Sequence, residues 1–341
     1  MNKERIFKMK KSIIRIICAF LSILMLISSA ILLSSCEKDK KKIVIYSSSE
    51  DYIIEYMQEK MDEKFPDYEI VFEYKSTGDH AAVLKSAGKN TECHISHDIE
   101  YAYAEQIAAA GVFANIKDIV DFSIYTDDVV QSDYFAPEIR NSGAIIVNLD
   151  VINEKGLDIP KSYEDLLDPQ YKGLISMPNP KASGTGYMFL LSLVNAWGEE
   201  AAFDYFDKLS ENILSYTSSG SGPVNALIGK EVAIGLGMTF MGASKISDGE
   251  NLKILHFEEG APYTLYGMGI VAGNETDEAV VEVFKYLAGE LTYAKNEMYF
   301  PEKLYKDTDF TVDNFPTDIK YSDMSNNTPE RKEDLLSKWT H

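Results

Sequence analysis

Cysteine and histidine are scarce in this chain, with three and five copies among 341 residues. Cys18 lies within an apolar run near the N-terminus and Cys36 lies just after it, so Cys93 is the only cysteine beyond this N-terminal region. An internal disulfide within the chain beyond it is therefore excluded, and the stability of that part must come from its core.

Sequence motifs of hydrolytic enzymes are also missing. Gly-x-Ser-x-Gly, His-Glu-x-x-His and the Walker phosphate loop do not occur. Ser86 and Lys89 match the Ser-x-x-Lys pair of penicillin-binding enzymes, but the companion Lys-Thr-Gly is absent. Few histidines and no evident base for a serine disfavour nucleophilic catalysis. An exported hydrolase is therefore only the second alternative function, and no catalytic residue is assigned.

Metal-ligating residue types gather in the segment Cys93–Asp98, which reads CHISHD. Zinc sites usually draw paired ligands from two distant segments, and His80 and His256 offer no second pair. The segment has the pattern of a strand, in which alternate residues point to opposite faces. We therefore predict no metal site and no cofactor.

Basic residues are outnumbered, with 33 Lys and Arg against 54 Asp and Glu and a net charge of −21. Residues 1–35 hold six of the basic residues and one acidic residue, so the rest of the chain has 27 against 53, a net charge of −26. Such a surface repels nucleic acid and anionic lipid, so neither is an expected partner.

The N-terminus has the pattern of an export signal. A basic stretch up to Arg15 precedes the apolar run Ile16–Leu33, and Leu-Ser-Ser-Cys then leads into EKDKKK. This pattern resembles a bacterial lipoprotein signal, which implies a signal peptide over residues 1–35, lipidation of Cys36 and a tether over residues 36–42. The alternative is an uncleaved transmembrane anchor. Both place the rest of the chain outside the cytoplasmic membrane.

Apolar strand patterns alternate with helical patterns along the remaining chain. Strands are expected at Ile43–Ser47, Glu69–Tyr74, Ala144–Asn148, Leu174–Met177, Ile213–Thr217, Leu252–Phe257 and Gly267–Gly273, and helices at Asp79–Ala87, Glu100–Ala110, Glu199–Ser210 and Glu278–Ala288. This alternation predicts an α/β fold with mainly parallel sheets, whose ligands sit at the carboxyl ends of strands. From Asp307 onward the pattern is polar and irregular.

Three loops between a strand and a helix are rich in small polar residues: Tyr46–Asp51, Lys181–Tyr187 and Thr217–Val224. The amide groups at a helix start can be capped by a Ser or Thr side chain, or they can hold an anion. Three such loops in one chain suggest that they meet at a common cleft. The candidate ligand-binding residues are Ser48, Ser49, Ser183, Gly184, Thr185, Ser219, Ser221 and Gly222.

Four sequence blocks carry a family resemblance: KKIVIYSSSE, NPKASGTGYMFLLSL, GSGPVNALIGKEVAIGLGMTF and EEGAPYTLYGMGIVAG. Together they resemble the substrate-binding lipoproteins of ABC importers, in the group that binds ferric iron, thiamine, aminoethylphosphonate and sugar phosphates. The resemblance implies a type II periplasmic-binding-protein fold, with two α/β lobes, two hinge strands and a ligand cleft between the lobes. It also implies a monomer that delivers a small-molecule ligand to an ABC permease and its ATPase.

The same resemblance implies where the chain crosses between lobes. It would cross near Asn141–Gly143 and return near Pro262–Gly267. The first lobe would then hold residues 43–140 and 267–341, and the second lobe, with the hinge strands, residues 141–266.

The resemblance also bears on the ligand. Iron-binding relatives typically carry two adjacent tyrosines after the strand that reads AIGLG here, where this chain has Met238 and Thr239, and often a histidine where it has Ser49 or Glu50. These departures favour a small anionic solute, a phosphonate or phosphate ester, with Thr239 as a contact. Ferric iron is the alternative.

Tyrosines and an acidic residue complete the candidate site. Glu259, Tyr263 and Tyr266 are expected near the second hinge strand, where the carboxylate could bind an amine or sugar hydroxyls and a tyrosine could cap a phosphate. Tyr101 is a further candidate ligand. Tyr101, Tyr103, Tyr263 and Tyr266 could supply phenolates to iron in another arrangement.

Overall fold

The computed structural model describes residues 40–129 and 131–341. The expected signal peptide, the lipidation site Cys36 and most of the tether lie outside the described residues. Residues 43–66 and 70–341 form one compact unit, to which the description below applies, and the described residues 40–42 and 67–69 are assigned to a second. No helix in the described part of the chain is long and apolar enough to span a bilayer.

The strands form one series in the order β2-β1-β3-β9-β4-β7-β5-β6, and β8 pairs with β4. Their bounds are β1 Lys41–Ser47, β2 Tyr68–Tyr74, β3 Ile95–Glu100, β4 Ala136–Asn148, β5 Ile175–Pro178, β6 Ile213–Thr217, β7 Ile234–Met238, β8 Leu252–Leu255 and β9 Tyr263–Ile270. The long strand β4 joins two groups of strands. Residues 136–142 of β4 pair with β9, whereas residues 143–148 pair with β7 and β8.

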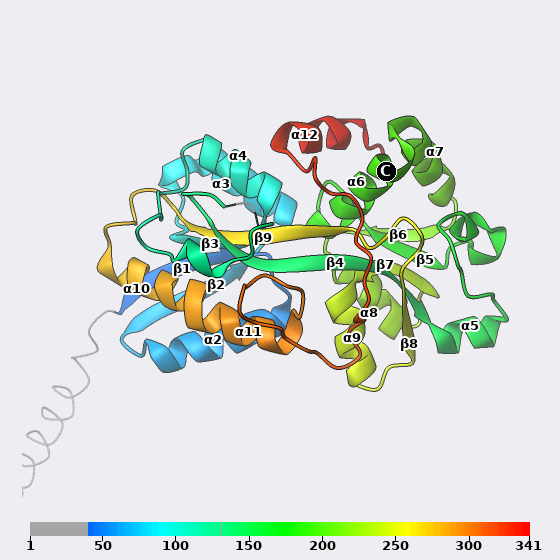
Figure 1. Ribbon diagram of the computed structural model, residues 1–341, viewed down its shortest axis with the longest axis horizontal. Helices are drawn as coiled ribbons and strands as arrows, with labels where there is room; N and C mark the ends of the chain where they lie inside the picture. Colours follow the sequence, from blue (N-terminus) through cyan, green and yellow to red (C-terminus); the bar gives the residue numbers. More distant parts are fainter. Residues whose placement is uncertain (1–39, 130) are drawn as a thin grey trace, which may run out of the picture. The chain divides into compact units, whose positions relative to one another are not determined.

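The two strands that connect these groups, β4 and β9, lie side by side (Figure 1). One carries the chain out of the β1–β3 group and the other brings it back, so they pair antiparallel. The pairings β3–β9, β4–β7 and β4–β8 are antiparallel as well, and β1–β3, β5–β6 and β5–β7 are parallel. The predicted α/β fold is confirmed, but its sheet is mixed rather than mainly parallel, because strand–helix alternation does not reveal returning strands such as β9.

Helices cover both faces of the sheet. Their bounds are α2 Asp51–Lys64, α3 Thr77–Ala87, α4 Tyr101–Ala109, α5 Leu149–Lys155, α6 Gly184–Trp197, α7 Glu199–Leu209, α8 Gly222–Ile228, α9 Thr239–Ser247, α10 Glu278–Tyr286, α11 Thr292–Tyr299 and α12 Pro329–Lys338. In Figure 1, α3 and α4 lie on one side of the β1–β3 group and α2, α10 and α11 on the other. Helix α6 is buried from Gly184 to Val194, so its apolar sequence fills the core beside β5 and β7.

The C-terminal segment differs from expectation in two ways. Helix α12 was not expected, although Thr328 caps it by accepting from the Arg331 amide and Pro329 occupies its first turn. Leu335 and Trp339 belong to the core that contains α6 and α7. The end of the chain therefore packs with α6 and α7 of the expected second lobe, and residues 267–341 do not all pack with the expected first lobe. The reason is the apolar face of α12, which continues into the fully buried Trp339.

Candidate functional site

A small polar cavity lies where the segments that follow β1, β2, β5, β6 and β7 meet strand β3 and the crossing strands β4 and β9. Its volume is about 30 Å³. The lining residues are Ser48, Glu50, Ile53, Thr77, Asp98, Ile139, Asn141, Ser183, Thr185, Gly220, Met238, Phe240, Tyr266 and Phe300. They come from both strand groups, so the cavity is closed only while the two groups stay together.

Four helices start at this cavity without a side-chain cap. The N-cap residues of α2, α6, α8 and α9 are Glu50, Ser183, Ser221 and Met238, and none of their side chains bonds to a helix amide. Helices α5, α10 and α12, which contribute no residue to the cavity, are each capped by their own Asn, Asp or Thr side chain. Helices α4 and α7 also start without such a cap, so the convergence of four starts, rather than a missing cap, distinguishes the cavity.

The start of α6 offers the clearest set of donors. Its first backbone bond runs from the Tyr187 amide to the Ser183 carbonyl, over 3.0 Å. The amides of Gly184, Thr185 and Gly186 are therefore the unpaired donors expected at a helix start. A Cβ atom on Gly184 would lie 2.5 Å from the Tyr266 hydroxyl. Only glycine lets the tyrosine approach this closely.

Two carboxylates face the same cavity, and no lysine or arginine lines it. Burial raises the pKa of Glu50 to about 7, although a hydrogen bond from Ser221 opposes the shift. Burial and then the charge of Glu138 raise the pKa of Asp98 to about 6. Both shifts arise mainly because each carboxylate loses water, and the charges of His97 and Lys295 oppose the rise at Asp98 only in part.

A buried network holds the first loop in place. The Ser48 hydroxyl lies 3.0 Å from Nδ1 of His80, whose Nε2 lies 3.0 Å from the Ser96 hydroxyl. Burial lowers the pKa of His80 to about 3, so this ring is neutral at physiological pH. Next to it, the Ser47 hydroxyl lies 2.9 Å from Nδ1 of His97.

His97 continues the network to a buried ion pair. Its Nε2 lies 2.8 Å from Oε1 of Glu138, which also pairs with Lys295. Burial alone would raise the pKa of Glu138, but the charges of His97 and Lys295 lower it to about 2. Lys295 is thus engaged with Glu138, which leaves the cavity carboxylates without a cation of their own.

The structure brings part of the candidate set together. Ser48, Ser183, Thr185 and Tyr266 line the cavity. The remaining loop residues Ser49, Gly184, Ser219, Ser221 and Gly222 flank it, and Thr239 accompanies two lining neighbours, Met238 and Phe240. Ser49 donates to Asp98 over 2.8 Å, and the Thr239 hydroxyl accepts from Ser142 over 2.8 Å.

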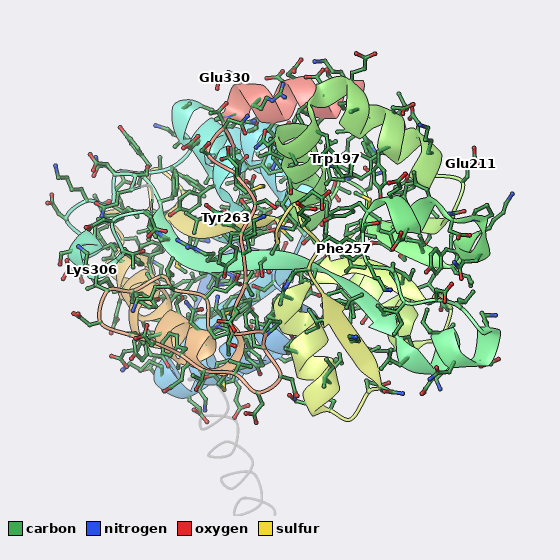
Figure 2. All side chains as sticks on the ribbon, turned by 45° about the vertical axis from the view of Figure 1, so that its right-hand side comes forward. Trp197, Glu211, Phe257, Tyr263, Lys306 and Glu330 are labelled. Carbon is green, nitrogen blue, oxygen red and sulfur yellow. The ribbon has the colours of Figure 1, made fainter. Side chains whose placement is uncertain are left out.

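Three candidates lie elsewhere. Tyr101 packs edge-on against Phe135 in the core beside β3. Glu259 accepts from the indole of Trp197, over 3.2 Å, in the part of the molecule built on α6 and α7 (Figure 2). Tyr263 packs against Tyr321 of the C-terminal segment. None of the three contributes to the cavity lining.

Sequence reasoning missed both acidic lining residues. The sequence pattern marks Asp98 only as a possible metal ligand, and Glu50 only as a position where iron-binding relatives often carry a histidine. The sequence carries a signal for Asp98, because the strand pattern ISHDIE holds three ionisable side chains. In the structure every residue of this strand, β3, is buried. No group of three or more His, Cys, Asp or Glu side chains that could hold a metal occurs among residues 40–129 and 131–341.

The crossing strands and the cavity beside them define a periplasmic binding protein of type II. The solved structure of the periplasmic binding protein AfuA from Actinobacillus pleuropneumoniae, with exogenous fructose-6-phosphate bound, is similar over 88% of this chain and 98% of its own. The TM-score is 0.77 and the identity 22%. A periplasmic thiamin binding protein is similar with a TM-score of 0.72 and 16% identity, over 88% of this chain and 96% of its own.

The family model for bacterial extracellular solute-binding proteins matches residues 102–302, more than half of the sequence. The chain therefore belongs to this family, whose members bind solutes for ABC transport and are not enzymes. A Haemophilus influenzae protein of uncharacterised function is 26% identical over 260 residues, 73% of each chain. A Salmonella typhi protein, provisionally named a 2-aminoethylphosphonate-binding periplasmic protein, is 25% identical over 160 residues. That alignment spans 45% of this chain and 46% of the relative.

Proposed function

We propose that this protein captures a small solute with a phosphonate or phosphate-ester group and delivers it to the permease of an ABC importer. The observation that carries the proposal is the convergence of the starts of α2 and α6 and the Ser219–Ser221 loop on one cavity. The Salmonella typhi relative, named for a phosphonate, supports the same class of anion.

The energies suit a small anion. A helix start stabilises a negative group by about 0.3–2 kcal/mol, and each charge-assisted hydrogen bond adds about 1.5–3 kcal/mol. Micromolar affinity needs about 8 kcal/mol. The three α6 amides with the hydroxyls of Ser183 and Thr185 can supply this without a basic side chain.

We further propose that binding closes two lobes about β4 and β9. The register supports this assignment, because β4 changes partner between Ser142 and Gly143, where Ser142 faces Tyr263 and the Gly143 amide donates to the Pro262 carbonyl over 2.8 Å. A solute that touches both strand groups stabilises the closed form through these added contacts. The permease would then recognise the closed form.

The anchoring of the protein also belongs to the proposal. Cys36 would carry lipid after cleavage at residue 35, which holds the binding unit at the outer face of the cytoplasmic or outer membrane. The tether over residues 36–42 would separate the two.

Ferric iron is the second candidate, and one observation favours it: Glu50, Asp98 and Tyr266 bring three oxygen ligands to one cavity. Burial raises the pKa of Tyr266 well above its usual value, which opposes phenolate formation without a metal. A tyrosinate–iron absorption band in freshly purified protein would favour this function over ours.

The decisive experiment combines ligand recovery with a variant. Native mass spectrometry of freshly purified protein should release a phosphonate or phosphate ester. Thr185→Val keeps the volume but removes a lining hydroxyl, so affinity for that solute should fall about ten- to a hundredfold. Thr340→Val, at an exposed C-terminal position, is the control. Equal binding by Thr185→Val and the native protein would contradict the role of the α6 start.

A further inference from the structure

Asp98 has a geometry that is specific to its place in the fold. The pairing of β3 with β9 shifts register between Ser96 and Ile99, so a bulge interrupts the ladder beside the cavity. Asp98 sits in this bulge with a φ of 55°, in the left-handed region that few residues other than glycine adopt. Bulges next to binding sites commonly redirect one side chain.

The carboxylate of Asp98 is only half satisfied. Its Oδ2 accepts from the Ser49 hydroxyl over 2.8 Å, whereas Oδ1 is buried and has no hydrogen-bond partner. Asp98 is 7% exposed and lines the cavity. A buried carboxylate oxygen without a partner destabilises the empty protein, and at the wall of a cavity it can be satisfied by a donor that arrives with the solute.

The cation that could have satisfied Asp98 is already in use. The backbone amide of Asp98 donates to Oε2 of Glu138 over 2.8 Å, and Glu138 pairs with Lys295 and His97. That network fixes the Asp98 backbone, but His97 and Lys295 bond to Glu138 and act on the Asp98 side chain only through their charge, without a direct bond. Glu50, the other acidic lining residue, also has no basic partner among the lining residues.

We propose that Asp98 and Glu50 form a subsite for a protonated amino group, so that the solute is a small zwitterion. This inference rests on the proposed function, because it places the anionic group of the same solute at the start of α6. A zwitterion can contact the amides at the start of α6 with its anionic group and the two carboxylates with its amino group. A plain anion leaves Oδ1 of Asp98 without a hydrogen-bond partner and is repelled by Asp98 and Glu50.

The test uses aminoalkylphosphonates with one to three methylenes and the matching alkylphosphonates, which lack the nitrogen. Calorimetry at neutral pH should show that the amino compounds bind about ten- to a hundredfold more tightly, the range of one charge-assisted hydrogen bond. Hydroxyalkylphosphonates of the same lengths should bind like the alkyl compounds. If hydroxyalkylphosphonates bind as tightly as the amino compounds, the proposal that the subsite recognises a positive charge is wrong.

Variants assign the preference to residues. Asp98→Asn keeps the shape, and asparagine tolerates the left-handed backbone; together with Glu50→Gln it should abolish the preference for the amino compounds over the matching alkyl compounds. Glu59→Gln, an exposed acidic position on the same helix α2, is the control and should keep the preference. Thermal unfolding of each variant identifies any variant that fails to fold. The comparison of amino and alkyl compounds on the native protein does not depend on the variants.

Other outcomes separate the two proposals. If neither series binds, the proposed anionic solute is wrong. If both series bind equally, only the amino subsite is wrong. Amine-independent binding that is lost on chelation and restored by a divalent cation would show that the two acids hold a metal, which also overturns the subsite.

Discussion

Gly78 offers a test of cavity closure, because it touches the opposite wall. It is the second residue of α3, and its amide donates to the Ala182 carbonyl, just before α6, over 3.1 Å. A Cβ atom at this position would lie 2.6 Å from the Lys181 carbonyl oxygen. Gly78→Ala therefore cannot fit the closed form without moving one wall.

The expected loss of solute affinity is the sum of two effects, the overpacking by the added methyl group and the distortion of the hydrogen bond from Gly78 to Ala182. Overpacking costs about 1–3 kcal/mol, and distortion of one hydrogen bond costs about 0.5–1.5 kcal/mol. Together they predict solute affinity about ten- to a thousandfold weaker, at about 1.4 kcal/mol per tenfold step. Stability should move the other way, since alanine favours a helix over glycine by about 0.5–1 kcal/mol and the open form has no clash.

The assay pairs calorimetry of an aminoalkylphosphonate with urea unfolding of the solute-free protein. Gly289→Ala is the matched control, because this helical glycine is exposed and its Cβ would meet no atom within 4 Å. Unchanged affinity in Gly78→Ala would refute closure at this contact. A loss of solute-free stability of about 1–3 kcal/mol would instead mean that the two walls are fixed together.

Three further predictions concern anchoring, the core and pH. Cys36→Ser should release the protein from membranes on fractionation; retention would favour the uncleaved anchor. Lys332→Met should lower unfolding stability by about 3–5 kcal/mol by leaving buried Glu100 unpaired, and adding Glu100→Gln should recover most of it in urea titrations; no recovery would contradict the pair. The raised pKa of Glu50 means that its stabilising contribution is complete below about pH 4.5 and is lost as the pH rises through about 7. Glu50→Gln should therefore stabilise the solute-free protein at pH 8 by up to about 3 kcal/mol, with the difference vanishing below pH 4.5; equal stability at both pH values would refute the burial argument.

Local sequence patterns predicted the frame of the site well. The loops before α2, α6 and α8 each follow a strand and start a helix, as their small polar residues indicated. Ser48, Ser183 and Thr185 line the cavity because they follow the carboxyl ends of β1 and β5, and ligands of open α/β sheets bind at those strand ends. These assignments depended only on neighbours within a few positions along the chain.

The position of Asp98 in the cavity lining depends on contacts between residues far apart in the sequence, which no local sequence pattern predicts. The orientation of Asp98 requires a bulge against β9 and a bond to Glu138, 40 residues away. Tyr263 and Glu259 failed to reach the cavity for the same kind of reason. The C-terminal segment covers the first, and Trp197 at the end of α6 bonds to the second.

Two contacts join the strand groups and should respond differently when the cavity opens. Lys332 of α12 pairs with Glu100 and lies over the ring of Tyr187 of α6, at 4.2 Å. Glu100 faces Tyr266 of β9 in the strand register, so this pair sits beside the crossing strands, where a hinge moves least. Gly78 has no such strand pairing and meets the opposite wall only through the Lys181–Ala182 loop. Removal of the Lys332 charge should therefore change stability more than affinity, and Gly78→Ala should change affinity more than stability. If both changes altered the two quantities in parallel, the crossing strands would not act as the hinge.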